Sequence, residues 1–319
     1  METINHRQGT EIMLQEPKEL TTEIYAELPS DLRLEDRESA FTKDLMRGLR
    51  VGSFLEGPSF DRQGNLLMVD IAHGRILKLS PGRDWSVLAQ YDGQPNGLKV
   101  HADGRIFVAD RANGIVIVDP ISGAVETFLG PDRLPGYKGL NDLFFASNGD
   151  LYFTDQGATG LHDPSGRLFS YRADGSIDCL LNNIPSPNGL VMSPNEDELY
   201  LAVTRASAVW RVPFRESGEV HRVGIYCQLP GGGGPDGMAV DSGGNLIVAH
   251  AGMGCVSVFS ANPRGLPLYH IRACDGGLSI TNIAFGGPEN KTLFITNSSN
   301  QNVLTAKMPL AGHPMFSHN

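Results

Sequence analysis

The chain has 319 residues and a formal net charge of −10 at pH 7, with 36 Asp and Glu against 26 Lys and Arg. An acidic chain without a cluster of basic residues is a poor match for nucleic acid or anionic membranes, so neither is expected as a partner. No apolar run approaches the ~18 residues of a membrane-spanning helix, and the first residues lack the organisation of a signal peptide. We therefore expect a cytoplasmic protein.

The four cysteines agree with that compartment. Cys179, Cys227, Cys255 and Cys274 are widely spaced and form no C-x-x-C pair, and we expect all four to be reduced. The 38 glycines and 20 prolines indicate a turn-rich chain, as in all-β proteins.

Two predicted elements lie at the start of the chain. After an extension over residues 1–20, Thr21–Glu27 is expected to form a strand that has no local partner. Residues 32–49 are rich in Glu, Asp and Arg with a few apolar positions, and we expect a short helix there, lying across one face. This helix would cap a channel or contact another copy of the chain in a homo-oligomer.

A repeated pattern dominates the rest of the chain. Six segments place an amide or carboxylate side chain at the same point, 40 to 48 residues apart, and these side chains are Glu56, Asn96, Asn141, Asn188, Asp236 and Asn282. This period falls in or near the range for propeller blades, roughly 40 to 50 residues. A radial repeat would bring all six side chains to one axis.

Each copy then continues as short strands. In the first copy an apolar run is followed by a turn at Arg62–Gly64 and a second strand at Leu66–Asp70, and the second copy has its second strand at Ile106–Asp110. Two further strands follow in most copies, for example Arg75–Leu79 and Trp85–Ala89. Short strands separated by Gly and Asn turns indicate hairpins, and four antiparallel strands make one blade.

The sixth copy is short, because the chain ends soon after Val303–Lys307. We predict that the N-terminal strand completes this blade and closes the ring, which removes an exposed sheet edge. The predicted fold is an all-β, six-bladed β-propeller with four antiparallel strands per blade. One domain is expected over residues 21–308, with innermost strands beginning near residues 56, 96, 141, 188, 236 and 282, followed by a C-terminal tail over residues 309–319.

The six repeated side chains predict a cation site at the mouth of the channel. All six offer oxygen, and none is Cys or His, which favours Ca²⁺ or Mg²⁺ over Zn²⁺ and copper. We expect one divalent ion, Ca²⁺ first, with Mg²⁺, Mn²⁺ or Zn²⁺ as alternatives, bound by three or four of these residues. The competing interpretation is that Asn-Gly and Asp-Gly pairs are turn formers, although this does not explain Glu56.

The second strands add a further prediction. Their ends return to the same face as the six repeated side chains, and the residues there are Asp70, Asp110, Asp155, Val203 followed by Thr204, His250 and Asn297. The sequence therefore predicts a second, acid-rich ring at this mouth.

Four motifs resemble those of the SMP-30/gluconolactonase/LRE-like family of six-bladed propellers. They are Glu56-Gly-Pro, Asn141-Asp, Ser186-Pro-Asn188-Gly and Pro235-Asp236-Gly, and the resemblance covers about residues 50 to 308. It implies a metal-dependent lactone hydrolase, and a related phosphotriester hydrolase shares the fold. It also implies that Glu56, Asn188 and Asp236 bind the metal directly, with Asn141 as a fourth ligand or a substrate contact.

One position departs from the family. Its sugar-acid lactonases have Arg two residues before the residue that corresponds to Asn141, where this chain has Gly139. A guanidinium is a bidentate donor suited to a polyhydroxylated substrate, so we expect a less polar or differently substituted lactone.

Two carboxylates are candidates for the base that activates water. The resemblance places Asp236 between metal and substrate, which makes it the first choice. Asp142 is the second, because it is an additional carboxylate beside the ring. The alternative for Asp142 is that it supports Asn141 without taking part in the chemistry.

Substrate contacts are expected around the ring. Asn96, Asn141 and Asn282 belong to the ring itself, and His162, Arg205 and His250 are candidates by location. The alternative for the histidines is a structural role. The insertion over residues 156–167 overhangs this mouth and either acts as a lid or specificity loop, or packs on a neighbouring blade.

Three functions remain open from the sequence. The first is a metal-dependent lactonase that acts on a small-molecule lactone. The second is a phosphotriesterase-like hydrolase that uses the same ion. The third is a non-enzymatic metal-binding or interaction propeller, which the lack of a histidine base in the ring mildly supports.

Overall fold

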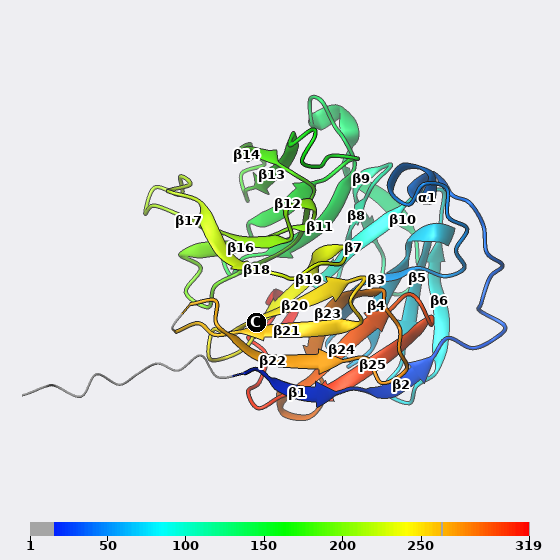
Figure 1. Cartoon of the computed structure of the whole chain (residues 1–319). Helices are drawn as coiled ribbons and strands as arrows, with labels where there is room; N and C mark the ends of the chain where they lie inside the picture. The colour runs from blue at the N-terminus through cyan, green and yellow to red at the C-terminus, as the bar shows by residue number, and fades with distance from the viewer. Residues whose placement is uncertain (1–15, 263, 319) are drawn as a thin grey trace, which may run out of the picture.

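The computed structural model describes residues 16–262 and 264–318, and it is a six-bladed β-propeller (Figure 1). Six sheets surround a central channel, and each innermost strand contacts the innermost strand of the next sheet, with the last returning to the first. The predicted fold class is confirmed.

The first four blades each follow the predicted pattern of four antiparallel strands. From the innermost strand outward, they are β3 (Leu55–Phe60), β4 (Leu66–Asp70), β5 (Arg75–Leu79) and β6 (Trp85–Gln90); β7 (Pro95–Val100), β8 (Ile106–Asp110), β9 (Gly114–Val118) and β10 (Val125–Leu129); β11 (Leu140–Phe145), β12 (Leu151–Asp155), β13 (Gly166–Tyr171) and β14 (Ile177–Ile184); and β15 (Pro187–Met192), β16 (Glu198–Val203), β17 (Ala208–Pro213) and β18 (Gly224–Gln228).

The last two blades incorporate the N-terminal segment. The fifth contains β19 (Gly234–Val240), β20 (Leu246–Ala251), β21 (Cys255–Phe259) and β22 (Pro267–Arg272), and the sixth contains β23 (Ile280–Gly286), β24 (Thr292–Asn297) and β25 (Asn302–Lys307). Short 3₁₀ turns connect several strands, namely η1 (Ile71–His73), η2 (Pro131–Arg133), η3 (Thr204–Ala206) and η4 (Pro288–Asn290), and a fifth, η5 (Phe316–His318), follows the last strand.

The N-terminal strand closes the ring as predicted. β2 (Glu23–Glu27) pairs antiparallel with β25 and completes the sixth blade. The structure adds one strand that the sequence did not predict, because β1 (Lys18–Thr21) pairs parallel with β22 and gives the fifth blade five strands (Figure 1). Residues 18–20, expected in the extension, therefore lie in a sheet, and residues 1–15 lie outside the described part of the chain.

The predicted helix is shorter than its expected span of residues 32–49. α1 covers only Ala40–Leu45, and Ser39 caps its first turn by accepting a hydrogen bond from the Thr42 backbone and donating its own backbone N–H to Thr42 Oγ1. Flanking residues pair with one another through the Arg37–Val51 bridge, which holds the segment as a closed loop. Its apolar side packs on the blade below, with the rings of Phe41 and Phe54 5.2 Å apart.

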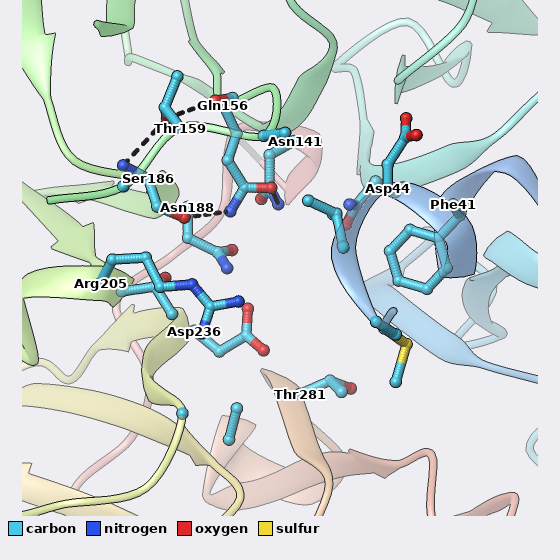
Figure 2. A pocket seen from close by; sticks show the side chains of 18 of the residues that line it. Phe41, Asp44, Asn141, Gln156, Thr159, Ser186, Asn188, Arg205, Asp236 and Thr281 are labelled. Atoms are coloured by element: carbon cyan, nitrogen blue, oxygen red, sulfur yellow. Dashed lines mark hydrogen bonds between the residues drawn. The ribbon is translucent and has the colours of Figure 1, made fainter. Parts of the chain in front are cut away.

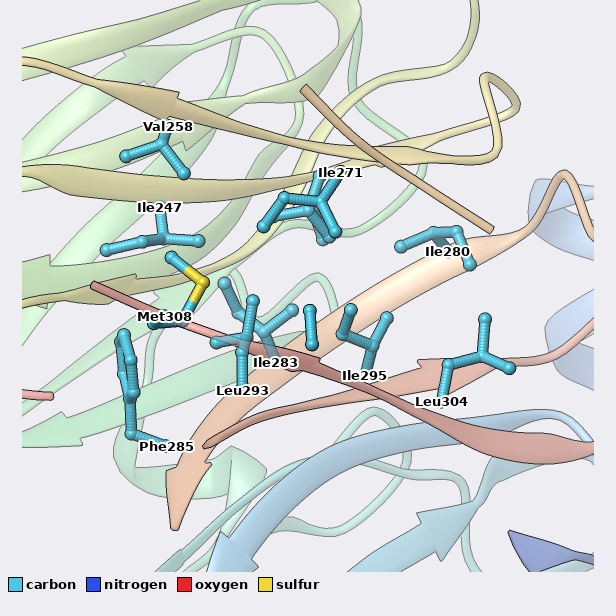
Figure 3. Packing of buried hydrophobic residues seen from close by; sticks show 13 residues of the cluster. Ile247, Val258, Ile271, Ile280, Ile283, Phe285, Leu293, Ile295, Leu304 and Met308 are labelled. Atoms are coloured by element: carbon cyan, nitrogen blue, oxygen red, sulfur yellow. The ribbon is translucent and has the colours of Figure 1, made fainter. Parts of the chain in front are cut away.

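Apolar packing between neighbouring blades holds the ring together. Between the fifth and sixth blades, Ile247, Val258 and Ile271 face Ile283 and Ile295 across a fully apolar layer (Figure 3). Burial falls from the axis outward: every residue of β3 and β4 is buried, whereas Ala89 alone is buried in β6. The innermost strands are thus fixed on both sides, which gives a rigid frame for groups at the channel.

All six innermost strands carry a register irregularity at the repeated polar residue. The irregularities lie at Glu56/Ser59, Pro95/Gly97, Leu140/Leu143, Pro187/Leu190, Pro235/Met238 and Ile280/Asn282. A β-bulge re-aims side chains, and bulges are common beside functional sites. The repeat seen in the sequence is therefore a repeated bulge.

None of the helices formed by residues 16–262 and 264–318 is long and apolar enough to cross a membrane.

Candidate functional site

A cavity of about 680 Å³ opens at the end of the channel where the innermost strands begin, which we call the upper mouth. Five of the six predicted ring residues line it: Glu56, Asn96, Asn141, Asn188 and Asp236. The sixth, Asn282, does not line it. The prediction that the repeated side chains converge on one axis thus agrees with the structure. The six positions are not equivalent, because five line the cavity and Asn282 does not.

Glu56 is held by two donors from different blades. Its Oε2 accepts hydrogen bonds from the Gly57 backbone at 2.7 Å and from Asn282 Nδ2 at 2.9 Å. Burial raises the pKa of the Glu56 carboxyl to about 8, although both hydrogen bonds lower it. Asn282, predicted as a substrate contact, instead braces this carboxylate from beneath the cavity.

Asn141 is oriented by a chain of hydrogen bonds. Its Nδ2 donates to Gln156 Oε1 at 3.0 Å, and Gln156 Nε2 donates to Ser186 Oγ at 3.1 Å (Figure 2). The amide is therefore assigned with its nitrogen turned away from the ring, and its Oδ1 is buried with no hydrogen-bond partner in the described structure. An unpartnered buried carbonyl oxygen is costly unless a cation or a donor reaches it.

Asp236 and Asn188 lie next to one another at the same mouth (Figure 2). Burial, together with the charges of Glu56 and Asp142, raises the pKa of Asp236 well above its usual value, while a hydrogen bond from Asn188 and the charge of Arg205 lower it. Carboxylates this close cannot all ionise without a compensating positive charge.

Asp142 lies deeper than the cavity lining. Its side chain is 4% exposed, its Oδ1 accepts the Leu143 backbone N–H at 2.8 Å, and the same oxygen lies 3.8 Å from Lys99 Nζ. Burial raises the pKa of Asp142, and Lys99 lowers it. Its location fits the alternative of a supporting carboxylate better than direct contact with a substrate.

The glycines after the ring residues allow neighbouring strands to approach closely. A Cβ on Gly97 would lie 2.3 Å from Asp142 Oδ1, and a Cβ on Gly237 would lie 1.9 Å from Asn282 Oδ1. These glycines follow Asn96 and Asp236 inside strands, not in tight turns. The turn-former interpretation of the Asn-Gly and Asp-Gly pairs is therefore wrong at both positions.

The predicted acid-rich second ring is also wrong. Asp70, Asp110 and Asp155 lie at the ends of their strands as expected, but they are fully buried and do not line the upper mouth. They accept backbone N–H groups of the loops that enter the innermost strands: Phe54 to Asp70, Gln94 to Asp110 and Gly139 to Asp155. Asn297 similarly donates to Asp275. Only Thr204, which follows Val203, lines the mouth.

The candidate substrate contacts separate in the structure. His162 and Arg205 are exposed and line the upper mouth, and in Figure 2 the Arg205 guanidinium extends toward Asp236. His250 does not line it: this side chain is buried, and its Nε2 lies 3.2 Å from the Gly231 carbonyl oxygen. The structural alternative therefore holds for His250. Residues 158–162 of the 156–167 loop form part of the rim.

An apolar wall faces the polar ring. Phe41, Leu45 and Met46 of the N-terminal segment line the cavity together with Phe54 and Ile71. The sequence indicated that this segment could cap the channel, but not which residues would face the cavity. Gln156 was also missed as a member of the site, although it directly follows the end of a second strand.

The space that a side chain at position 139 would occupy is taken by Arg111, a residue of the second blade. Gly139 has a φ of +129°, and a Cβ there would lie 2.8 Å from Arg111 Cγ. Arg111 is buried, and its Nη2 lies 3.3 Å from Asp44 Oδ2 beneath α1. Arg111 does not line the cavity. Its contact with Asp44 instead holds α1 against the second blade.

The donor set at the upper mouth fits a hard cation. In the described part of the chain no group of three or more His, Cys, Asp or Glu side chains is placed to hold a metal. The upper mouth instead combines two carboxylates with amide oxygens, including the unpartnered Oδ1 of Asn141. Oxygen-only donors of this kind suit Ca²⁺ or Mg²⁺.

These features define a six-bladed propeller with an oxygen-lined mouth under a helical cap. The chain belongs to the SMP-30/gluconolactonase/LRE-like family, whose model matches residues 54–299. It is 30% identical over 239 residues to the lactonase drp35 of Staphylococcus aureus strain MW2, covering 69% of this chain and 70% of that protein. The corresponding protein of Staphylococcus saprophyticus is 31% identical over 230 residues, with the same coverage.

Solved structures agree on the fold. A calcium-binding protein, regucalcin, from Agrobacterium tumefaciens superposes with a TM-score of 0.74 at 18% identity, covering 95% of this chain and 99% of that one. A gluconolactonase from Xanthomonas campestris superposes with a TM-score of 0.69 at 24% identity, covering 90% of this chain and 99% of that one.

Proposed function

We propose that this protein is a divalent-metal-dependent lactonase that hydrolyses a cyclic ester to its hydroxy acid. Family membership and the staphylococcal lactonases as relatives support the activity. The observation that carries the metal dependence is the buried, unpartnered Oδ1 of Asn141, which lies at a mouth shared with two buried carboxylates.

Glu56, Asn141, Asn188 and Asp236 are the proposed ligands. All four contribute oxygen, so Ca²⁺ is the first choice, with Mg²⁺, Mn²⁺ or Zn²⁺ as alternatives. A divalent cation held by these oxygens supplies Lewis-acid polarisation of the lactone carbonyl and the positive charge that favours ionised carboxylates.

Asp236 is the proposed base. It lines the cavity, whereas Asp142 lies below it beside Lys99. The Asp236 carboxylate accepts a proton from water while the water oxygen bonds to the carbonyl carbon. The ring C–O bond then breaks, and the departing alkoxide takes a proton to give the hydroxy acid.

The walls of the cavity favour a lactone with an apolar substituent. One side is polar, with the Arg205 guanidinium available to donate hydrogen bonds, and the apolar surface of Phe41 and Leu45 lies across the cavity from it. A ring substituent that packs on this surface gains the free energy of burying apolar area, roughly 25 cal/mol per Å². A polyhydroxylated sugar lactone would lose hydrogen bonds to water there.

The proposal is tested with the full chain, stripped of metal by EDTA and then titrated with Ca²⁺, Mg²⁺, Mn²⁺ and Zn²⁺. Calorimetry and thermal unfolding report binding, and acid release reports hydrolysis of γ-, δ- and aromatic lactones and of a phosphotriester. We expect one bound ion, a rise in Tm, and lactone hydrolysis that requires the ion. Hydrolysis and Tm that are both unaffected by EDTA would exclude the metal site, and a preference for the phosphotriester would overturn the lactonase assignment.

Asp236→Asn separates base from ligand. Asparagine retains an oxygen, so we expect partial loss of metal affinity but a fall in turnover of about 10²- to 10⁴-fold. Asp61→Asn is the matched control, because Asp61 is a carboxylate in a turn that accepts the Gln63 and Asn65 backbone N–H groups. Full turnover in Asp236→Asn would exclude Asp236 as the base.

A further inference from the structure

The channel has a second cavity at its opposite end, where the innermost strands finish. It has a volume of about 300 Å³ and is lined by strand-end residues that include Phe144, Met192, Met238 and Phe285. We call this end the lower mouth. The volume lies at the lower limit for small-molecule pockets, which range from about 300 to 1,000 Å³ and are mostly apolar.

The C-terminal tail forms one wall of this cavity. His313 donates its backbone N–H to the Val240 carbonyl at 2.8 Å, and the Phe316 ring stacks on Phe145 with centroids 5.4 Å apart. Between them, Pro314 and Met315 line the cavity. The tail is therefore an ordered part of the wall, fixed by backbone and aromatic contacts at both ends.

Lys99 is the ammonium group in this otherwise largely apolar lining. Its side chain is 18% exposed, its Nζ donates to the Leu98 carbonyl at 3.2 Å, and Asp142 Oδ1 lies 3.8 Å away, beyond hydrogen-bond distance. An ammonium group has three donors, and these contacts use one. Lys99 can therefore donate to a ligand without losing its present partner.

The acidic residue of the lining does not compete for this ammonium. Both oxygens of Glu196 accept hydrogen bonds from Ser147, from its backbone N–H and from its hydroxyl, each at 2.7 Å. Lys99 thus lines a largely apolar chamber as an ammonium group that is paired with Asp142 at 3.8 Å and still has unused donors. Apolar walls with one cationic anchor complement a molecule with an apolar body and one negative end.

We propose that the lower mouth is a second ligand site, which binds a small amphipathic monocarboxylate with its carboxylate on Lys99 and its apolar body among Phe144, Met238 and Phe285. The site is separate from the upper mouth, because it is built from the opposite ends of the same strands. The proposal stands independently of the lactonase activity.

Methionine methyl groups of the full chain provide the test. Met192, Met238 and Met315 line the lower mouth, whereas Met46 lines the upper one. With ¹³C-methyl methionine labelling, titration with octanoate should shift the three lower-mouth resonances along one saturable curve and leave Met46 unchanged. Octanamide has the same body without the charge, and we expect it to bind at least tenfold more weakly.

Variants identify the site. Lys99→Met should remove the tenfold preference for octanoate, and Lys78→Met, a half-buried lysine outside the cavity, should retain it. Because Lys99→Met leaves Asp142 without its cation, Ala239→Phe provides a second variant: it fills the cavity from a half-buried position and should abolish binding of both probes. The proposal is overturned by equal affinity for octanoate and octanamide in the wild-type protein, by shifts at Met46 alone, or by binding that survives Ala239→Phe.

Discussion

Asn282 Nδ2 donates a 2.9 Å hydrogen bond to Glu56 Oε2, so that a residue of the last blade fixes a carboxylate of the first, 226 positions away in the chain. The Gly57 backbone donates to the same oxygen at 2.7 Å. Neither donor engages Oε1, so the carboxylate has one braced oxygen and one left for the cavity. One contact between the first and last blades therefore also orients a proposed metal ligand.

Asn282→Ala should weaken the proposed metal site without removing a ligand. Groups that orient metal ligands typically change affinity by 10- to 100-fold when they are lost. We expect a fall in Ca²⁺ affinity of that size in calorimetric titration of the EDTA-treated protein, with hydrolysis reduced at limiting Ca²⁺ and largely restored at saturation.

Asn245→Ala is the matched control. Asn245 Nδ2 donates to Asp241 Oδ2 at 2.8 Å, an equivalent amide–carboxylate pair in a turn outside the cavity. The Asn245→Ala variant should have a lower free energy of unfolding and an unchanged Ca²⁺ affinity. Equal losses of affinity in the two variants would mean that the Asn282 effect is general destabilisation.

The stability of the metal-free protein should fall as pH rises. The pKa of Glu56 is raised from 4.5 to about 8 in the folded state, mainly by burial, so the folded state binds the proton more tightly than the unfolded chain. Its contribution is fully present below pH 4.5 and is lost as pH rises through about 8. In the presence of EDTA, the Tm of the wild type should therefore fall relative to the Tm of Glu56→Gln when the pH is raised from 5 to 8.5.

Saturating Ca²⁺ should reverse that trend, because a cation favours the charged carboxylates at high pH. Thermal unfolding at both pH values, with EDTA and with Ca²⁺, gives the comparison. A Tm difference between the two proteins that is independent of pH in EDTA would contradict the buried, protonated state of Glu56.

Gly97→Ala should destabilise the channel. Its Cβ would lie 2.3 Å from Asp142 Oδ1 and 2.6 Å from Asp142 Cα, so two innermost strands must move apart. Overpacking of this kind costs ~1–3 kcal/mol. Gly224→Ala is the control, since no atom lies within 4 Å of its added Cβ, and it should change the free energy of unfolding by less than ~0.5 kcal/mol. Similar chemical-denaturation midpoints for the two variants would refute the close approach.

The architecture could be predicted because it repeats. Six copies with the same spacing identify six blades, and a sixth copy without an outer strand indicates closure by the N-terminal strand β2. Five ring residues converge on one mouth because each occupies the same bulge of its innermost strand. β1 could not be predicted in the same way, because it has no counterpart in the other copies.

Side-chain roles that depend on the surrounding loops could not be predicted. Asp155 occupies a column that the topology brings to the upper face, yet its oxygen is taken by the Gly139 backbone N–H. Likewise, the His250 ring nitrogen Nε2 is engaged by the Gly231 carbonyl oxygen. Strand position predicts which face a residue approaches, but not whether a nearby backbone group will capture its side chain.

Gly139→Arg offers a test of why this chain differs from the sugar-acid lactonases that it resembles. Gly139 has a φ of +129°, and a side chain there would meet Arg111 Cγ at 2.8 Å and the Arg111 carbonyl oxygen at 3.3 Å. A non-glycine residue in such a conformation costs of order 1–3 kcal/mol, and the displaced Arg111 would lose its contact with Asp44. We therefore expect a loss of stability of at least ~1 kcal/mol and no gain in hydrolysis of gluconolactone. Lys138→Arg adds a guanidinium at the neighbouring, half-buried position, and it should leave Tm nearly unchanged. If Gly139→Arg folded as stably as wild type and hydrolysed gluconolactone faster, the single substitution would account for the expected difference in substrate, and the Arg111–Asp44 contact would have no part in it.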